Sequence, residues 1–93
     1  MIGSFACKDT ERLHHGERVK RWPEDLSRVA RRKLAQVAVS TLLSDLAVPP
    51  GNCLEALKGN RKGQHSIRVN SQWRLCFIWK GDAAANVEMV DYH

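Results

Sequence analysis

Apolar residues recur at helical spacing in residues 26–38, and mostly arginine and glutamine fill the positions between them. Pro23, Glu24 and Asp25 stand at the start of this pattern. Proline suits a first helical turn because its missing N–H would have no partner there, and the two carboxylates complement the helix dipole. We therefore predict a long amphipathic helix from Pro23 onward, with an apolar face of Leu26, Val29, Ala30, Leu34, Val37 and Ala38.

Shorter elements are predicted on either side of this helix. The opening stretch MIGSFAC is typical of a short strand, and Asp9 or Thr10 would cap a brief helix through His15. Ser40 or Thr41 would cap one further turn before VPPGN breaks the helical pattern.

After Asn52 the pattern changes from helical spacing to alternation. The segments CLEAL, HSIRV, WRLCFIWK and NVEMVDYH are each typical of a strand, and KGNRKGQ is a basic turn between the first two. Helices come first and antiparallel strands follow, which predicts an α+β fold with one sheet packed against helices. A chain of 93 residues has room for one domain, so we expect a single domain over residues 1–93.

The register of the second and third strands gives the sheet two different faces. A three-residue loop over residues 70–72 would pair Arg68 with Arg74 on one face. Like charges opposed across a strand pair repel, so the pair suggests a bound anion, although both side chains could also splay into water. The same register gives the other face three apolar pairs: Val69 with Trp73, Ile67 with Leu75, and His65 with Phe77.

The last hairpin extends both faces. A turn around GDAA would pair Phe77 with Val87 and Leu75 with Met89, and it would carry Tyr92 onto the face of Arg74. The neighbours of Tyr92, which are Asp91 and His93, would begin on the opposite face. An alternative for this terminal trio is a frayed end, since last residues usually fray.

Composition narrows the classes of partner. Fifteen Lys and Arg against ten Asp and Glu give a formal charge of +5, which favours a polyanion or acidic partner over neutral ones. Cys7, Cys53 and Cys76 are widely spaced, and we expect them to be small buried hydrophobes in a reducing compartment. Neither a signal peptide nor a run of eighteen apolar residues is present in the sequence, so we expect a cytoplasmic protein without membrane contact.

The chemistry that these residues favour needs no metal. His14 and His15 are adjacent and lack acidic partners at ligand spacing, so we expect neither a metal nor another cofactor. Cleavage of RNA by its own 2′-OH needs a base, an acid and cations on the phosphate. Arg68 and Arg74 would supply the cations, and the basic turn would add Lys58, Arg61 and Lys62. Protons would come from Asp91, Tyr92 and His93.

The three tryptophans have separate expected roles. Trp73 and Trp79 share the apolar face and are expected in the core. Trp22 directly precedes Pro23 in a basic loop, where it could staple the long helix or stack on a base, and we favour the staple.

The stretch LEALKGNRKGQHSIRVNSQWRLCFIW and the terminal VDYH resemble the HigB-type host-inhibition toxins of the RelE/ParE superfamily. The most specific parts are LKG, SIRV, WRLCF and DYH, and the likeness is closest to the GraT branch. The resemblance implies a RelE-like microbial ribonuclease-type fold, with two or three N-terminal helices on an antiparallel sheet of about four to five strands.

The resemblance also implies a function. Such toxins belong to type II toxin-antitoxin systems and cleave the message in the ribosomal A site, which inhibits translation and growth. A HigA-like helix-turn-helix antitoxin neutralises them, and operator DNA is bound only through the toxin-antitoxin complex. On the matching positions, Asp91, Tyr92, His93 and Arg74 would be catalytic, and Lys58 would contact phosphate.

One position departs from the family pattern. The family carries a histidine two residues before its LK, where this chain has Glu55. A glutamate could still act as a base, although its charge repels phosphate. His65 could replace the missing histidine, although the register assigns it to the core face.

Two other functions fit parts of the sequence. A ParE-like inhibitor of DNA gyrase would act by binding alone, and a non-catalytic protein binding RNA or DNA would use only the basic surface. Neither would need the acid–base groups of the terminal trio.

Overall fold

The computed structural model describes residues 1–92. The helices are α1 (Lys8–His14) and α2 (Glu24–Val39), followed by the 3₁₀ helices η1 (Leu43–Ala47), η2 (Pro50–Asn52) and η3 (Gly59–Arg61). The strands are β1 (Glu55–Ala56), β2 (His65–Arg68), β3 (Trp73–Lys80) and β4 (Ala83–Asp91). Within this part of the chain the strands form one antiparallel sheet in the order β1-β2-β3-β4. The α+β fold predicted from the order of elements is confirmed.

The long helix begins where the sequence predicted. Pro23 has extended backbone angles and is the N-cap residue, so the helix starts one residue later, at Glu24. The cap predicted for α1 was wrong, since Cys7 occupies that position. Thr10 is fully buried and its hydroxyl accepts a hydrogen bond from the Met89 N–H, which ties α1 to β4. Its side chain thus serves the contact between the two elements instead of the helix end.

The predicted turn after α2 is present, but neither Ser40 nor Thr41 caps it. Ser40 ends α2, and its hydroxyl donates to the Gln36 carbonyl. The carboxylate of Asp45 accepts hydrogen bonds from the N–H groups of Thr41 and Leu42, so the cap of η1 comes from Asp45.

The predicted register between β2 and β3 is confirmed. Arg68 pairs with Arg74, and the pairs of His65 with Phe77 and Ile67 with Leu75 form as predicted. Leu75 also pairs with Met89 of β4. The pairing of β3 with β4 then shifts by one residue between Cys76 and Ile78, next to Asn86 with its φ of 52°. The prediction of one continuous register through Val87 therefore missed a bulge.

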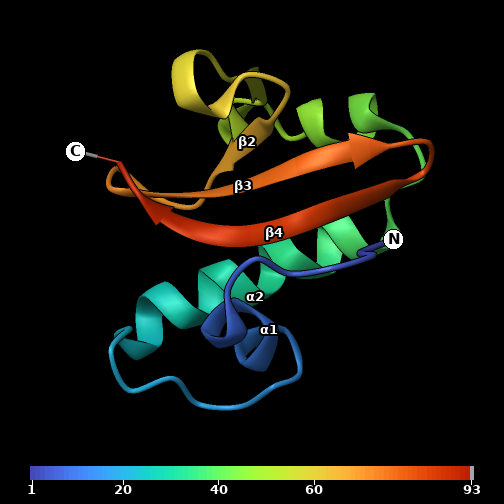
Figure 1. Cartoon of the computed structure of the whole chain (residues 1–93). Coiled ribbons are helices and arrows are strands. Elements are labelled where there is room, and N and C mark those ends of the chain that lie inside the picture. Colours follow the sequence, from blue (N-terminus) through green and yellow to red (C-terminus); the bar gives the residue numbers. More distant parts are fainter. Residues whose placement is uncertain (93) are drawn as a thin grey trace.

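The opening segment lies beside β4 but is no regular strand. Ile2 and Phe5 form isolated parallel bridges with Ala84 and Val87. Figure 1 shows this segment along β4, with α1 and α2 on one side of the β3–β4 ribbon and β2 with the 3₁₀ segments on the other. The two ends of the described chain lie at opposite ends of the molecule (Figure 1).

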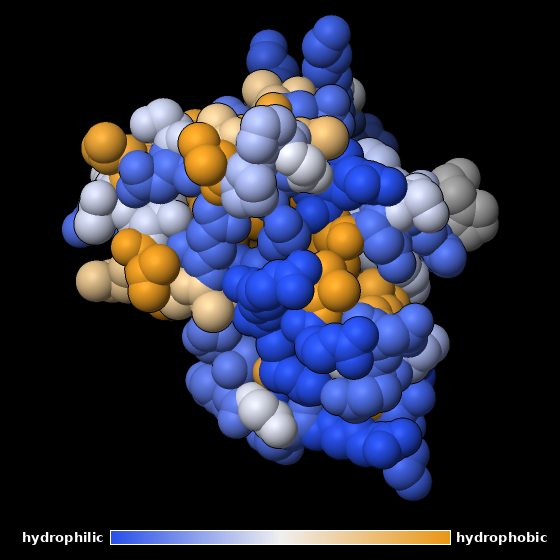
Figure 2. Space-filling view, turned by 180° about the vertical axis from the view of Figure 1, so that it is seen from behind, coloured by the Kyte–Doolittle hydropathy of each residue, from blue (hydrophilic) through white to orange (hydrophobic). Residues whose placement is uncertain are grey.

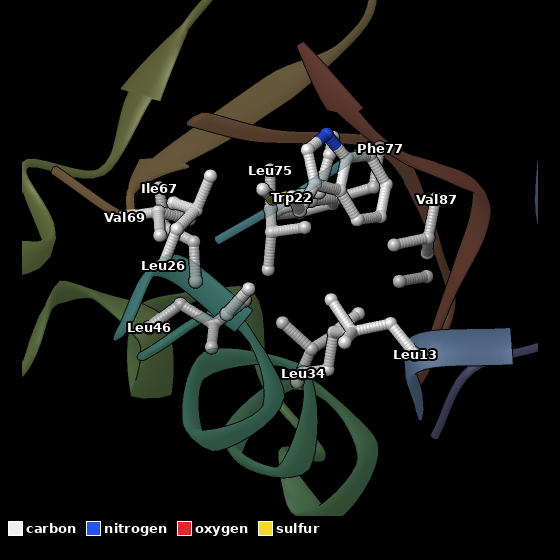
Figure 3. Close-up of a cluster of buried hydrophobic side chains, with 14 of the residues drawn as sticks. Leu13, Trp22, Leu26, Leu34, Leu46, Ile67, Val69, Leu75, Phe77 and Val87 are labelled. Carbon is white, nitrogen blue, oxygen red and sulfur yellow. The ribbon is translucent and has the colours of Figure 1, made fainter. Parts of the chain in front are cut away.

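The core fills the space between α2 and the sheet. Leu34 from α2 and Leu13 from α1 point toward side chains of the strands, among them Leu75 and Phe77 (Figure 3). Trp22 is 4% exposed and joins the same cluster, with its ring edge-on to Trp73 at 6.0 Å. Trp22 is therefore a core residue and is not available to stack on a base, and the favoured staple of α2 stays a prediction. Trp73 and Trp79 are only half-buried at the margin of the core.

Charge is unevenly distributed over the fold. Residues 8–33 hold nine Lys and Arg against five Asp and Glu, whereas residues 34–93 hold six against five. Strongly hydrophilic residues cover the helix side in Figure 2, and apolar residues gather near the end of α2. The apolar group includes Val39, Leu42 and Val48, which are 79%, 61% and 65% exposed. Most of the positive excess thus lies on α2 and on the loop before it, away from the outer face of the sheet.

The cysteines differ from their predicted burial. Cys76 is fully buried, but Cys7 is half-buried and Cys53 is exposed, so the prediction held for one of the three. Cys53 lies in the left-handed region with φ 47°, in the turn that follows η2. The turn brings its side chain to the surface.

Leu34 offers a test of the core. Leu34→Ala should lower the free energy of unfolding by about 2–5 kcal/mol, because Leu34 is fully buried and the deletion leaves a cavity. Leu42→Ala makes the same change at an exposed position and should alter stability by less than about 0.5 kcal/mol. Urea unfolding followed by circular dichroism measures both, and equal losses would contradict this assignment of the core.

Candidate active site

The outer face of the sheet, away from the helices, carries a polar row across all four strands. Glu55 of β1 pairs with Ser66 of β2, Ser66 with Cys76 of β3, and Cys76 with Glu88 of β4. Arg74 lies two residues before Cys76 on β3 and therefore on the same face. The candidate active site is this row together with Arg74, Arg61 and Tyr92.

Arg74 is held by its surroundings. Its Nε donates to Ser66 Oγ at 2.8 Å, and its Nη2 donates to the Cys53 carbonyl at 2.6 Å. The side chain is 14% exposed, and a Glu55 carboxylate oxygen lies 3.9 Å from Nη2. The described hydrogen bonds engage Nε and Nη2, so the N–H groups of Nη1 remain as donors for a ligand. A guanidinium fixed in this way can bind a phosphate with defined geometry.

Tyr92 lies beside Arg74, as the sequence predicted. The guanidinium carbon of Arg74 is 5.9 Å from the centre of the Tyr92 ring, which is within the range of a cation–π contact. Burial raises the pKa of Tyr92, and the neighbouring Cys76 thiol raises it further, while the charges of Arg61 and Arg74 act in the opposite direction. The phenol therefore keeps its proton at neutral pH and can donate it.

Arg61 reaches this face from the turn between β1 and β2. Its guanidinium donates to Glu88 at 2.9 Å and to Gln64 at 3.1 Å, and the bond to Glu88 raises the pKa of Arg61. Cys76 is fully buried in the sheet, and burial raises the pKa of its thiol. The charge of Arg61 is thus balanced by Glu88. Arg61 could contact a phosphate only by sharing or releasing the Glu88 carboxylate.

The remaining predicted residues within residues 1–92 lie at the surface of the protein. Lys58, Lys62 and Arg68 are exposed, with Arg68 opposite Arg74 in the register. The Asp91 carboxylate accepts a hydrogen bond from Gln72 Nε2 at 3.1 Å, and Asp91 pairs with Trp73 in the sheet. Asp91 therefore begins on the face opposite Tyr92, as predicted. His93 lies outside the described residues.

His65 does not join this face. It pairs with Phe77 in the sheet, and its buried Nδ1 has no hydrogen-bond partner among the described residues. The register thus keeps it on the core side, as predicted, away from Arg74. Glu55, which stands where the family pattern has a histidine, is the residue that lies near Arg74.

Sequence reasoning missed three contributors to this site. Ser66 and Glu88 could have been found. The register that opposes Arg68 and Arg74 assigns Ser66 to the outer face, and the register that pairs Leu75 with Met89 assigns Glu88 to it. The Cys53 carbonyl gave no signal, since a backbone oxygen has no pattern in the sequence. Its role depends on how the segment before β1 folds back toward β3.

Two features are absent from residues 1–92. No group of three or more His, Cys, Asp or Glu side chains there could hold a metal ion. None of the helices in that range is long and apolar enough to cross a membrane.

Comparisons with solved structures define the fold. The structure of a YafQ mutant from Escherichia coli matches with a TM-score of 0.60 at 15% identity, covering 98% of this chain and 93% of that one. The YoeB–YefM complex from Staphylococcus aureus matches with a TM-score of 0.58 at 17% identity, covering 100% and 98%. The chain thus has the RelE-like fold that YafQ and YoeB share.

Sequence comparisons define the family. A model of the RelE-like toxin of the type II toxin-antitoxin system HigB matches residues 3–93. Toxin HigB-1 of Vibrio cholerae serotype O1 is 45% identical over 87 residues, which are 92% of each chain. An uncharacterized protein of Haemophilus influenzae is 34% identical over 73 residues, covering 78% of this chain and 72% of that one. The chain belongs to the HigB-like family of type II toxins.

Tyr92 is the one tyrosine of the sequence, so its titration can be followed directly by phenolate absorbance. The midpoint should lie above the ordinary value of about 10 in the folded protein and return to it in denaturant, because burial raises the folded pKa. The unfolded chain then loses this proton first as the pH rises. The free energy of unfolding should therefore fall as the pH rises above about 10.

A substitution of Arg61 tests whether the described neighbours of Tyr92 set its pKa. Its positive charge lowers the pKa of Tyr92, so Arg61→Gln should move the midpoint higher still. Arg18→Gln removes an exposed arginine of the loop before α2 and should leave the midpoint where it was. A native midpoint below 10, or a downward shift in Arg61→Gln, would refute the described surroundings of Tyr92.

Proposed function

We propose that this HigB-like toxin is a metal-independent endoribonuclease that cleaves messenger RNA on the ribosome and thereby inhibits translation. The observation that carries the proposal is the contact between Arg74, held by Ser66 and Cys53, and the protonated phenol of Tyr92. Arg74 would bind the scissile phosphate, and Tyr92 would protonate the leaving oxygen. We also propose that the chain belongs to the GraT branch and works as one domain over residues 1–93.

The placement of Glu55 and Tyr92 supports an in-line reaction. Glu55 lies on β1 and Tyr92 follows β4, so the two come from opposite edges of the sheet with Arg74 between them. In the proposed reaction the 2′-OH attacks phosphorus as its proton passes to the Glu55 carboxylate. The bond from phosphorus to the 5′ oxygen breaks, and that oxygen takes the proton of Tyr92. A 2′,3′-cyclic phosphate and a 5′-hydroxyl result.

The other cations would bind the strand on either side of this phosphate. Arg68 lies opposite Arg74 in the sheet, and Lys58 and Lys62 are exposed at the two ends of η3. All three can contact neighbouring phosphates. Arg61 would do so by exchanging Glu88 for a phosphate. Asp91 and His93 would be catalytic groups, as the family pattern implies. The hydrogen bond from Gln72 would hold the Asp91 carboxylate.

The distribution of charge supports a large polyanion as the binding partner. Positive excess lies mostly in residues 8–33, whereas the catalytic face is nearly balanced by Glu55 and Glu88. Long-range attraction would therefore draw the toxin to the RNA of the ribosome, and Arg74 would select one phosphate of the message in the A site.

Membership of the HigB-like family implies an antitoxin as partner. We propose a HigA-like helix-turn-helix antitoxin that neutralises the toxin and through which operator DNA is bound. The site of action would be the cytoplasm, where ribosomes translate, with no cofactor required.

Tyr92→Phe tests the proposed acid. It removes one hydroxyl and should lower the rate of message cleavage by about 10²-fold or more, the usual contribution of a general acid. Primer extension on a message in a purified translation system measures the cuts. Ser44→Ala removes an exposed hydroxyl of η1 outside the site and should cleave at the wild-type rate.

Intact message at doses of wild-type protein that arrest growth would contradict the proposal. A supercoiling assay with purified gyrase then becomes decisive, because inhibition without ribosomes would indicate ParE-like action. Salt-sensitive binding to RNA or DNA, with neither cleavage nor growth arrest, would indicate a non-catalytic binding protein.

A further inference from the structure

Asn52 is the last residue of η2 and directly precedes Cys53. Its side chain is fully buried, at 0% exposed, and contacts α2. A buried amide has up to four hydrogen bonds to satisfy, and leaving them unmade is costly. Nothing in the reaction above uses Asn52, so its burial raises the question of what its side chain holds in place.

Four hydrogen bonds surround the Asn52 side chain. Its two Nδ2 hydrogens are shared among three acceptors, which are Gln36 Oε1 at 3.0 Å, the Leu46 carbonyl at 3.1 Å and the Val48 carbonyl at 3.3 Å. Its Oδ1 accepts a hydrogen bond from Lys33 Nζ at 2.5 Å. The amide thus joins two side chains of α2 to two carbonyls of the segment between η1 and η2.

The two partners on α2 form one rigid side of this joint. Lys33 and Gln36 are three residues apart, so they lie on the same side of the helix one turn from each other. Gln36 Nε2 also donates to the Val48 carbonyl. Burial, together with the nearby charge of Arg32, lowers the pKa of Lys33, which agrees with an ammonium drawn in toward the amide.

The other side of the joint leads directly to Arg74. The N–H of Asn52 donates to the Pro49 carbonyl at 2.9 Å, and the N–H of Cys53 donates to the Pro50 carbonyl at 3.0 Å. These bonds close the turn after which the Cys53 carbonyl accepts from Arg74 Nη2. The carbonyl belongs to no strand, so its position depends on the anchoring of this turn.

We propose that Asn52 is a positioning residue for Arg74. By fixing the turn to α2, its amide sets the Cys53 carbonyl and, through it, the plane of the guanidinium whose Nε is held by Ser66. The effect on RNA cleavage rests on the proposed function. The orientation of the guanidinium does not, and it can be measured without RNA.

Asn52→Asp tests this assignment at nearly constant volume. The carboxylate keeps an acceptor for Lys33 but cannot donate to Gln36, Leu46 or Val48. In nuclear magnetic resonance spectra of the free protein, the Nε–H signal of Arg74 should shift and its exchange with water should accelerate. Message cleavage should fall by about tenfold or more, because displacements near 1 Å can cost up to 10²-fold.

A second variant keeps the test valid if Asn52→Asp fails to fold. Lys33→Met removes one of the four hydrogen bonds from the helix side and should move the same Arg74 signal by a smaller amount. Asn86→Asp is the matched control, since Asn86 is exposed on β4 and its φ of 52° suits either residue. It should leave both the Arg74 signal and cleavage unchanged.

The outcomes separate the two claims. An unchanged Arg74 signal in folded Asn52→Asp, whatever its stability, overturns the positioning role. A shifted signal supports that role even if wild-type protein cleaves no message, a result that would count against the proposed function alone.

Discussion

The register between β2 and β3 is the constraint on which both faces of the sheet depend. Side chains alternate along a strand, so a shift of one residue would exchange the two faces. In the observed register Ile67 and Leu75 face the helices and are fully buried, while Ser66 and Arg74 share the outer face. The burial that stabilises the fold therefore also fixes which side chains meet RNA in the proposed function.

The outer face shows how a small protein holds a cation without a deep pocket. Arg74 is 14% exposed and lies against Ser66, the Cys53 carbonyl and the ring of Tyr92. These contacts come from β2, from the turn before β1 and from the end of β4, so the guanidinium joins parts of the chain far apart in sequence. The last described residues are thereby tied to the sheet instead of fraying, and the Tyr92 N–H also donates to the Gln72 carbonyl.

What could be predicted from the sequence followed from periodic burial. Alternation in HSIRV and WRLCFIWK was enough to oppose Arg68 and Arg74, and the hairpin with NVEMVDYH brought Tyr92 to the same face. Features that depend on one long-range contact were missed. Asp9 or Thr10 was expected to cap α1, yet Cys7 is the N-cap residue and the Thr10 hydroxyl accepts a hydrogen bond from β4. The Cys53 carbonyl became a partner of Arg74 through a turn that no local pattern encodes.

In the proposed function a fixed guanidinium, and not positive charge alone, binds the scissile phosphate. Arg74→Lys keeps the charge but loses the planar fork that reaches Ser66 and Cys53 together. Message cleavage in a purified translation system should fall by about 10²-fold, while Arg28→Lys on the exposed side of α2 should cleave like the wild type. Cleavage by Arg74→Lys at the wild-type rate would contradict this role of the guanidinium.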